Sequence, residues 1–226
     1  MQQDNCYGLI VGDIVTSTNY GKAEIIEIHS HTEVTLRFLA TGYIGTSTLR
    51  SIHRGAFKDP YHPRHAGKGF IGTGEYSSKL NGVNHPYYAH WRSMLDRCYD
   101  PKAISYKHYG AIGVTVCEEW YNYQVFAEWC DHNGWFEGAQ LDKDIKAGGK
   151  GMIYSPEFCM FVTPQENSEA AHAITYAFKS PEGVIHTGNN VSAFAREHNL
   201  SKQSLHKVKT GKYSHHKGWT KVESTE

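Results

Sequence analysis

The sequence lacks the features that place a chain in or across a membrane. No stretch approaches the roughly 18 apolar residues that a spanning helix needs, and the N-terminus lacks the apolar core of a signal peptide. Hydrophobic residues make up 39% of the chain and charged residues 20%, as in globular proteins. We therefore expect a cytoplasmic protein with no membrane partner.

Cysteine is scarce and irregularly spaced. The chain has five cysteines, an odd number, and no two of them form a C-x-x-C pair. This pattern argues against a disulfide framework and against a zinc ribbon. Buried free thiols are the expected role for Cys6, Cys98, Cys117, Cys130 and Cys159.

The chain also lacks an excess of charge of one sign, since its formal net charge is zero. A uniformly basic nucleic-acid binder is thereby excluded. The charge is unevenly distributed, however: residues 173–226 contain eight Lys or Arg against four acids. A basic tail of this kind is suited to binding phosphate groups, although a solvated lysine face would look the same.

With 226 residues the chain is long enough for two or three small domains. Short runs with period-2 alternation, at 8–15, 23–29, 33–38 and 43–52, predict a small bent β domain over residues 1–60. Residues 61–85 are rich in Gly, Pro, Ser and His, which predicts an extended linker. This linker is either a plain tether or a wrap that follows a phosphate backbone with Lys58, Arg64, Lys68 and Lys79.

A second compact region begins near Pro86. Helical spacing of apolar residues predicts one helix over 88–98 and another over 123–132. In the second helix we expect Val125, Phe126 and Trp129 on the buried side. Between the two helices, a turn punctuated by glycines should enter a strand near Val116.

The segment from Leu141 onward carries the most chemical information. It predicts a strand at 141–145, a polar loop, a second strand over 159–162, and a helix that begins at Pro164. Thr163 is a good N-cap, and Glu166 completes a capping box with it. Asn167 then lies in the first helical turn and points back toward the hairpin.

A β-hairpin followed by a helix, with acids on the first strand and an asparagine on the helix, is the arrangement of a ββα-metal nuclease. One divalent ion needs a carboxylate, a neutral oxygen ligand, and open positions for a phosphate and water. Asp142 and Asn167 supply such a pair, which predicts a site for Mg²⁺ or Mn²⁺.

The runs WRSMLDRCY, YGAIGVTVCEEWYNYQVFAEW, LDKDI and YSPEFCMFVTPQEN resemble the HNH-like homing endonucleases of bacteriophages. The resemblance covers residues 87–172 and implies a metal-dependent enzyme in a bacterial host cell. It implies the metal role for Asp142 and the helix ligand role for Asn167. Lys143 stands where the family has its catalytic histidine, and Phe158 or Cys159 stands near the usual middle asparagine.

The identity of the general base is therefore open. A lysine amine is protonated at neutral pH unless burial or a metal changes that, so Lys143 serves either as a tuned base or as a phosphate ligand. Asp144 is the other candidate, as a base or as a second metal ligand. Of the histidines at 90, 108, 132 and 172, His172 is the best placed, but it lies about 140° around the helix from Asn167.

Two other readings of this segment remain. Residues 144–146 form a D-x-K, the half-motif of restriction-type nucleases, in which Glu118 or Glu119 would supply the missing acid. Alternatively, Asp142 and Asp144 are a solvated or turn-stabilising pair. The lysine at position 143 also leaves open a DNA-binding regulator without nuclease activity.

The basic tail has the pattern of a helix-turn-helix. We expect one helix over 191–198, a turn at 199–200, and a second helix over 202–210 that is capped by Ser201 and closed by Gly211. Val191, Phe194 and Ala195 should face Leu205 and Val208. The predicted DNA-binding residues, on and just after the second helix, are Lys202, Gln203, Ser204, His206, Lys207, Lys209 and Lys212.

Residues 180–219 resemble the modular helix-turn-helix units that follow nuclease domains in homing endonucleases. The resulting prediction is an α+β chain with a β domain at 1–60, a linker at 61–85, an HNH-like nuclease domain at 86–175 and a DNA-binding module at 176–226. We expect a monomer that nicks or cleaves double-stranded DNA at a specific site. The predicted catalytic residues are Asp142, Lys143, Asp144 and Asn167.

Overall fold

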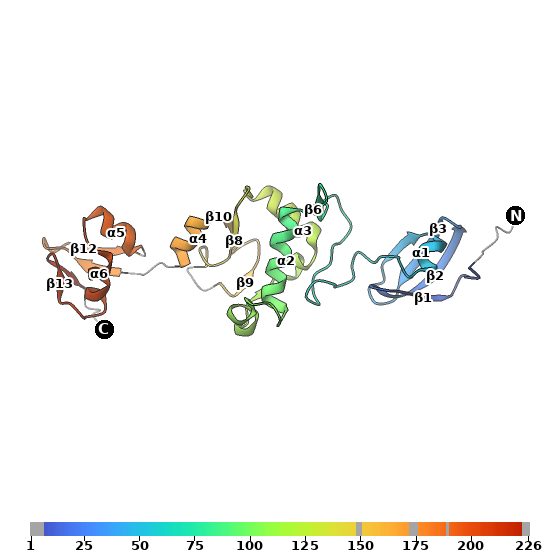
Figure 1. Ribbon diagram of the computed structural model, residues 1–226, viewed down its shortest axis with the longest axis horizontal. Helices are drawn as coiled ribbons and strands as arrows, with labels where there is room; N and C mark the ends of the chain where they lie inside the picture. The colour runs from blue at the N-terminus through green and yellow to red at the C-terminus, as the bar shows by residue number, and fades with distance from the viewer. Residues whose placement is uncertain (1–6, 148–150, 172–175, 189, 223–226) are drawn as a thin grey trace.

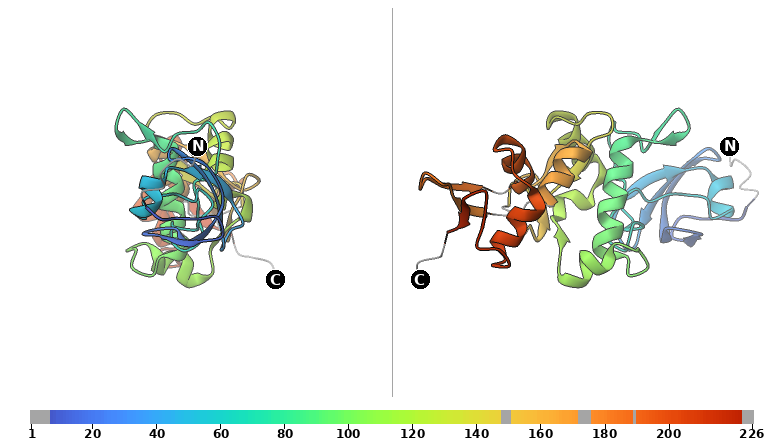
Figure 2. Two further views of the ribbon diagram at one scale, coloured as in Figure 1. Left: turned by 90° about the vertical axis from the view of Figure 1, so that its right-hand side faces the viewer. Right: turned by 60° about the vertical axis from the view of Figure 1, so that its left-hand side comes forward.

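Buried hydrophobic side chains gather in three clusters that lie in separate stretches of the chain. They were located in a computed structural model that describes residues 7–147, 151–171, 176–188 and 190–222. The three units follow one another along the longest axis of the molecule (Figure 1), and the right-hand view of Figure 2 shows the same order. The mixed α/β composition that the sequence predicts is confirmed, whereas the exact domain boundaries remain predictions.

The N-terminal unit is a four-stranded antiparallel meander. Its strands are β1 (Ile14–Ser17), β2 (Gly21–Ser30), β3 (Glu33–Phe38) and β4 (Ile44–Ser47), paired in chain order. Alternate residues of β2 and β3 are buried, as the period-2 pattern predicts. Two register shifts in the β2–β3 pair bend the sheet.

The expected strands at 8–15 and 43–52 are wrong in their extent. Only Ile14–Ser17 of the first region is a strand, and the second region divides into β4 and helix α1 (Leu49–His53). The side chain of Thr48 accepts a hydrogen bond from the Ser51 N–H and so caps α1. This local cap ends the strand and turns Leu49 and Ile52 into the core.

Residues 61–85, which we name the strap, lie against the central unit. The backbone of Phe70 exchanges hydrogen bonds with Tyr121 and Tyr123, each of 2.9 Å. The Gln124 side chain donates to the carbonyl of Tyr76 at 3.0 Å. Further along, the strap forms a small hairpin, β5 (Lys79–Leu80) and β6 (Val83–Asn84).

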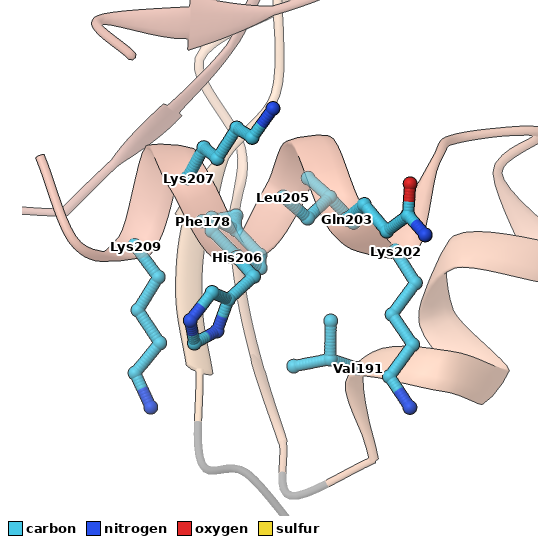
Figure 3. A pocket seen from close by; sticks show the side chains of 8 residues that line it. All are labelled: Phe178, Val191, Lys202, Gln203, Leu205, His206, Lys207 and Lys209. Carbon is cyan, nitrogen blue, oxygen red and sulfur yellow. The ribbon is translucent and has the colours of Figure 1, made fainter. Parts of the chain in front are cut away.

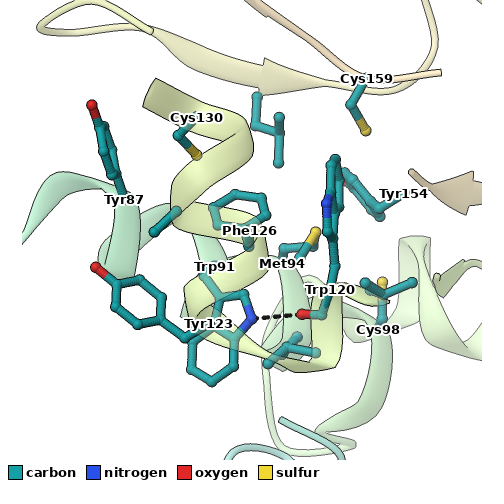
Figure 4. Packing of buried hydrophobic residues seen from close by; sticks show 14 of the residues in the cluster. Tyr87, Trp91, Met94, Cys98, Trp120, Tyr123, Phe126, Cys130, Tyr154 and Cys159 are labelled. Carbon is teal, nitrogen blue, oxygen red and sulfur yellow. Dashed lines mark hydrogen bonds between the residues drawn. The ribbon is translucent and has the colours of Figure 1, made fainter. Parts of the chain in front are cut away.

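The core of the central unit is built on α2 (Pro86–Tyr99) and α3 (Tyr123–His132). Both helices occur where the sequence predicts them. Trp91 and Trp120 are fully buried, and the Trp91 Nε1 donates to the Trp120 carbonyl at 2.7 Å (Figure 4). The expected burial of Phe126 is confirmed, whereas Val125 is exposed because the core lies on the Phe126 side of α3.

Short elements connect these helices to the hairpin segment. They are the 3₁₀ turns η1 (Tyr106–His108), η2 (Gly110–Ile112) and η3 (Glu118–Tyr121), and strand β7 (Thr115–Val116). Gly113, at φ +90°, lets the chain turn from η2 into β7. Strand β7 pairs in parallel with β9 (Ile153–Tyr154), which ties the loop after Asp142 to the core.

A β-hairpin and a helix follow, as predicted, but the first strand, expected over 141–145, ends at Asp142. Strand β8 (Gln140–Asp142) pairs antiparallel with β10 (Met160–Val162), and α4 (Pro164–Ala171) begins directly after β10. The capping box is present: Thr163 Oγ1 accepts from the Glu166 N–H at 3.1 Å, and Glu166 Oε2 accepts from the Thr163 N–H at 2.8 Å.

The C-terminal unit contains the two expected helices, α5 (Val191–Glu197) and α6 (Lys202–Lys209). Ser201 caps α6, and the five residues expected to join the helices are all buried. The sequence did not predict the sheet on which they pack. Its strand order is β12 (Ile185–Gly188), β11 (Tyr176–Lys179), β14 (Trp219–Lys221), β13 (His215–His216).

Among the described residues, no helix combines the length and apolar character needed to cross a membrane. Four of the cysteines are free thiols, and Cys98, Cys130 and Cys159 are buried, as the sequence predicts. Cys117 is half-buried, and Cys6 lies outside the described residues.

Candidate functional site on the hairpin and α4

Asp142 ends strand β8 and holds the start of the following loop. Its Oδ1 accepts hydrogen bonds from the backbone N–H groups of Asp144, at 2.9 Å, and Ile145, at 2.7 Å. The residue is only 7% exposed. Its Oδ2 has no hydrogen-bond partner among the residues that the structure describes, so one carboxylate oxygen is left for another ligand.

Asn167 lies in the first part of α4 and reaches back to the hairpin, as predicted. Its Nδ2 donates to Gln140 Oε1 at 2.7 Å, which leaves the Asn167 Oδ1 unused by that bond. Gln140 and Asp142 are two residues apart on β8, so their side chains share one face of the strand. Asn167 therefore contacts Gln140 on the face of β8 that also carries Asp142. Gln140 and Asp142 are one strand repeat, or roughly 7 Å, apart.

Lys143 is directed elsewhere. Leu141 lies in the core, and Lys143, in the bend that follows β8, is buried beside Tyr154 of the same core. Lys143 is 6% exposed, and its Nζ donates to Asp144 Oδ1 at 2.7 Å. The ammonium also lies over the rings of Tyr109 and Tyr154, at 5.3 Å and 5.7 Å from their centroids.

A second cation shares these two rings, and the sequence offered no sign of it. The guanidinium of Arg97, on α2, lies 5.3 Å from the Tyr109 ring and 5.5 Å from the Tyr154 ring. Its Nη1 donates to the Tyr154 hydroxyl at 3.0 Å, and its Nε donates to the Ser93 carbonyl at 3.1 Å. The cations of Arg97 and Lys143 thus both lie over the stacked pair of Tyr109 and Tyr154.

Asp144 also holds the loop. Its Oδ1 accepts from the Gly151 N–H at 3.0 Å as well as from Lys143. A side chain at 151 would collide with the Lys143 carbonyl, which explains glycine at this position. The hydrogen bonds of Asp142 and Asp144 therefore match the turn-stabilising interpretation, and among the described residues the Oδ2 atoms of both carboxylates are left without a hydrogen-bond partner.

The available donor set suits a metal that keeps most of its water. No group of three or more His, Cys, Asp or Glu side chains able to hold an ion occurs in the described part of the chain. Asp142 Oδ2 and Asn167 Oδ1 are two oxygen atoms on one face of the hairpin. Mg²⁺ often takes only one or two carboxylates from a protein and completes its shell with water and phosphate. These donor types suit such an ion and do not suit a closed zinc site.

The histidines of the central unit do not gather at Asp142. His90 packs on Phe161, which lies on the core face of β10 rather than on the Asp142 face. Burial and the nearby Arg97 lower the pKa of His90, so its imidazole is neutral at pH 7. His108 and His132 are exposed, and the Nδ1 of His132 bonds the Glu128 carbonyl. His172 lies outside the described residues.

The residues of the D-x-K interpretation have other contacts. Lys146 Nζ donates to the carbonyl of Cys159 at 2.8 Å, and Asp144 is bound to Lys143. Glu118 and Glu119 are exposed on η3. Among the described residues these groups form no acidic cluster.

In the C-terminal unit, the predicted DNA-binding residues divide between two sides of α6. Lys202, His206 and Lys209 extend to one side, where Figure 3 shows them around a hollow of about 390 Å³. Lys207 extends to the other side, and its Nζ lies 4.9 Å above the Tyr213 ring.

The remaining predicted residues of this set lie at the ends of α6. Gln203 is exposed, and Ser204 is half-buried with its N–H bonded to the capping Ser201. Lys212 is exposed in the turn after α6. Basic side chains therefore leave α6 on two sides, and only some of them can face one partner surface.

Comparisons with known proteins add little to this geometry. No family model matches the chain, and no curated protein matches it. A solved structure described as "DNA binding and cleavage by the HNH homing endonuclease I-HmuI" is similar over 46% of this chain and 67% of that chain. The identity is 17% and the TM-score is 0.22. A score this low supports no conclusion, so the proposed function rests on the residues described above.

Proposed function

We propose that this chain is a metal-dependent endonuclease of the HNH homing type, which nicks or cleaves double-stranded DNA at a specific site. The supporting observation is the pair of Asp142 and Asn167 on one face of a hairpin–helix unit. Asp142 keeps one carboxylate oxygen unpaired among the described residues, and Asn167 keeps its amide oxygen outside the bond to Gln140. Both oxygens suit Mg²⁺ or Mn²⁺.

In this proposal the two residues hold the ion against a phosphodiester group. The bound ion would neutralise charge on the phosphate and stabilise the leaving oxygen. The backbone N–H bonds to Asp142 Oδ1 fix the direction of its other oxygen. The capping box fixes the first turn of α4 and thereby the position of Asn167.

The two outer units would extend the contact with DNA. We propose that α6 and its basic side chains bind DNA away from the cut. Linking modest binding units in one chain raises affinity through effective concentration. One nuclease centre per chain is consistent with a monomer that cuts one strand at a time.

The test is cleavage of supercoiled plasmid DNA with Mg²⁺, with Mn²⁺ or with EDTA. We expect metal-dependent nicking by the wild type and its loss in Asp142→Ala and Asn167→Ala, with DNA binding retained. Glu137→Ala is the matched control, because this exposed acid precedes β8 and should leave nicking unchanged. Equal nicking by Asp142→Ala and the wild type would refute the proposed centre.

A DNA-binding regulator without nuclease activity is the second candidate. It is favoured by the burial of Lys143 at the position where the family has its base, and by the loop-holding bonds of both aspartates. Binding of duplex DNA without scission under any metal would support the regulator. Scission that depends on Asp142 would exclude it.

A further inference from the structure

A hollow of about 300 Å³ lies where the N-terminal unit meets the strap. We name it the junction hollow. Tyr20, from the β1–β2 turn, lines one side, and Lys58, His62, Arg64 and His65 line the others. It is distinct from the Asp142 site and from α6. Its lining combines two permanent cations with two imidazoles, and this composition points to an anionic ligand.

Arg64 is held in place at this hollow. Its Nη1 donates to the Tyr20 hydroxyl at 2.7 Å, and its Cζ lies 4.8 Å above the Tyr20 ring. His62 packs edge-on against the same ring, with the centroids 5.9 Å apart. A guanidinium has five N–H donors, and the bond to Tyr20 uses one of them. A guanidinium ordered in this way loses little entropy when it binds a phosphate oxygen.

The acid in this hollow is turned to internal partners. Asp59 is 1% exposed, its Oδ2 accepts from the Thr41 hydroxyl at 2.6 Å, and its Oδ1 accepts from the Tyr61 N–H at 2.8 Å. Lys58 is exposed and has no hydrogen-bond partner among the described residues. The groups available to a ligand from outside are therefore cationic.

Two further arginine contacts concern His65, on the wall of the hollow. Burial lowers the pKa of His65, the nearby Arg92 and Arg64 lower it further, and Asp96 raises it. Arg92 belongs to α2, where it pairs with Asp96 at 3.5 Å. Arg64 is therefore the nearby arginine without an acidic partner among the described residues.

We propose that the junction hollow binds a backbone phosphate of duplex DNA through Arg64 and Lys58. This inference rests on the proposed function, because it takes the ligand to be the same DNA that the Asp142 site would cut. In Figure 1 the strap lies on one side of α2 and the hairpin with α4 lies on the other. The strap, the hairpin and α6 therefore follow one another along the long axis.

The hollow suits a phosphate better than a base. Most of its lining residues carry a polar or charged group on the side chain, and Ile71 and Pro60 are the aliphatic ones. A phosphate contact contributes affinity without sequence information and makes binding depend on salt. The strap therefore anchors the duplex, and it leaves sequence selection to other surfaces.

The experiment measures DNA affinity against salt concentration, with the full chain, a short labelled duplex, and EDTA to prevent cleavage. We expect Arg64→Gln and Lys58→Gln each to reduce the slope of log K against log salt by about 0.9, and the double variant to reduce it by about twice that amount. Lys102→Gln is the matched control, since it removes an exposed charge from the turn after α2. Its slope should equal that of the wild type.

Melting temperatures of all variants check that they fold. Because Lys58 is exposed, its replacement tests the site even if Arg64→Gln disturbs Tyr20. Wild-type slopes in both variants would overturn the inference, and so would an equal fall in Lys102→Gln. Duplex RNA bound with the same dependence on Arg64 would overturn the assignment to DNA.

These outcomes are separable from those of the proposed function, because binding in EDTA does not need cleavage. Reduced slopes in a chain that never cuts DNA would support the phosphate site and refute the nuclease. Unchanged slopes in a chain that cuts through Asp142 would refute the phosphate site alone.

Discussion

Replacing Lys143 by methionine separates two roles for the residue that follows Asp142. In one role Lys143 is the general base. In the other it is a buried cation that holds the loop after β8 and thereby orients Asp142. The contacts of its ammonium with Asp144, Tyr109 and Tyr154 favour the second role.

The magnitude follows from those contacts. The ion pair reaches a carboxylate whose side chain is 42% exposed, so its contribution is discounted to about 0.5 kcal/mol. Each of the two ring contacts adds about 0.5–1 kcal/mol. Methionine has a similar volume, and burial of its apolar side chain recovers part of the stabilisation that is lost with these contacts. We expect a net loss of about 1 kcal/mol and a fall in melting temperature of about 2–4 °C.

The assay is the pH dependence of metal-dependent nicking, with melting temperature measured on the same samples. If Lys143 positions the loop, Lys143→Met should lower the nicking rate by less than about tenfold, because a distortion of about 1 kcal/mol changes a rate by that order. The shape of its pH profile should match that of the wild type. Lys143→Arg is the control that keeps the charge.

A different result would refute this reasoning. A fall of about 10²–10⁴-fold in rate, at unchanged melting temperature and with loss of one limb of the pH profile, is the signature of a removed general base. That result would place Lys143 in the reaction itself. It would also require the ammonium to leave the tyrosine pair when DNA binds.

Three further predictions test the scaffold and the tail. Thr163→Ala removes the cap of α4 and should cost about 1 kcal/mol of stability in chemical denaturation, and nicking should then need more Mg²⁺. Because burial and Arg97 lower the pKa of His90, its contribution to the free energy of unfolding should be present above about pH 6.5 and fall as the pH drops below that value. The free energy of unfolding of His90→Asn should therefore depend less on acid pH than that of the wild type, and other histidines should account for the dependence that remains. Lys202→Ala and Lys207→Ala should each weaken DNA binding and lower its salt slope by about one if they contact phosphates, and an unchanged slope in both would remove the α6 tail from the interface.

Local features of the chain were predicted well. The Thr163–Glu166 capping box, the Ser201 cap and the spacing of apolar residues in α2, α3, α5 and α6 act within a few residues of one another. Such interactions are the same in a short segment and in the folded chain. For that reason the hairpin–helix unit and the position of Asn167 on it were readable from the sequence.

Features that depend on distant contacts were not readable. The strap looks like a tether because few of its residues are aliphatic, yet its backbone pairs with residues 121 and 123, about fifty positions away. The sheet under α5 and α6 joins strands from both ends of the C-terminal unit. Neither leaves a periodic signal strong enough to detect in one short segment.

The sequence by itself determined where helices begin and which elements carry Asp142 and Asn167, because spacing and caps are properties of neighbouring residues. Only the tertiary structure decided how Lys143 and Arg64 are used. The approach of Tyr109 and Tyr154 buries the Lys143 ammonium, and the β1–β2 turn brings Tyr20 against Arg64, 44 residues away. The orientation of a long charged side chain is set by what surrounds it, and those surroundings come from the rest of the fold.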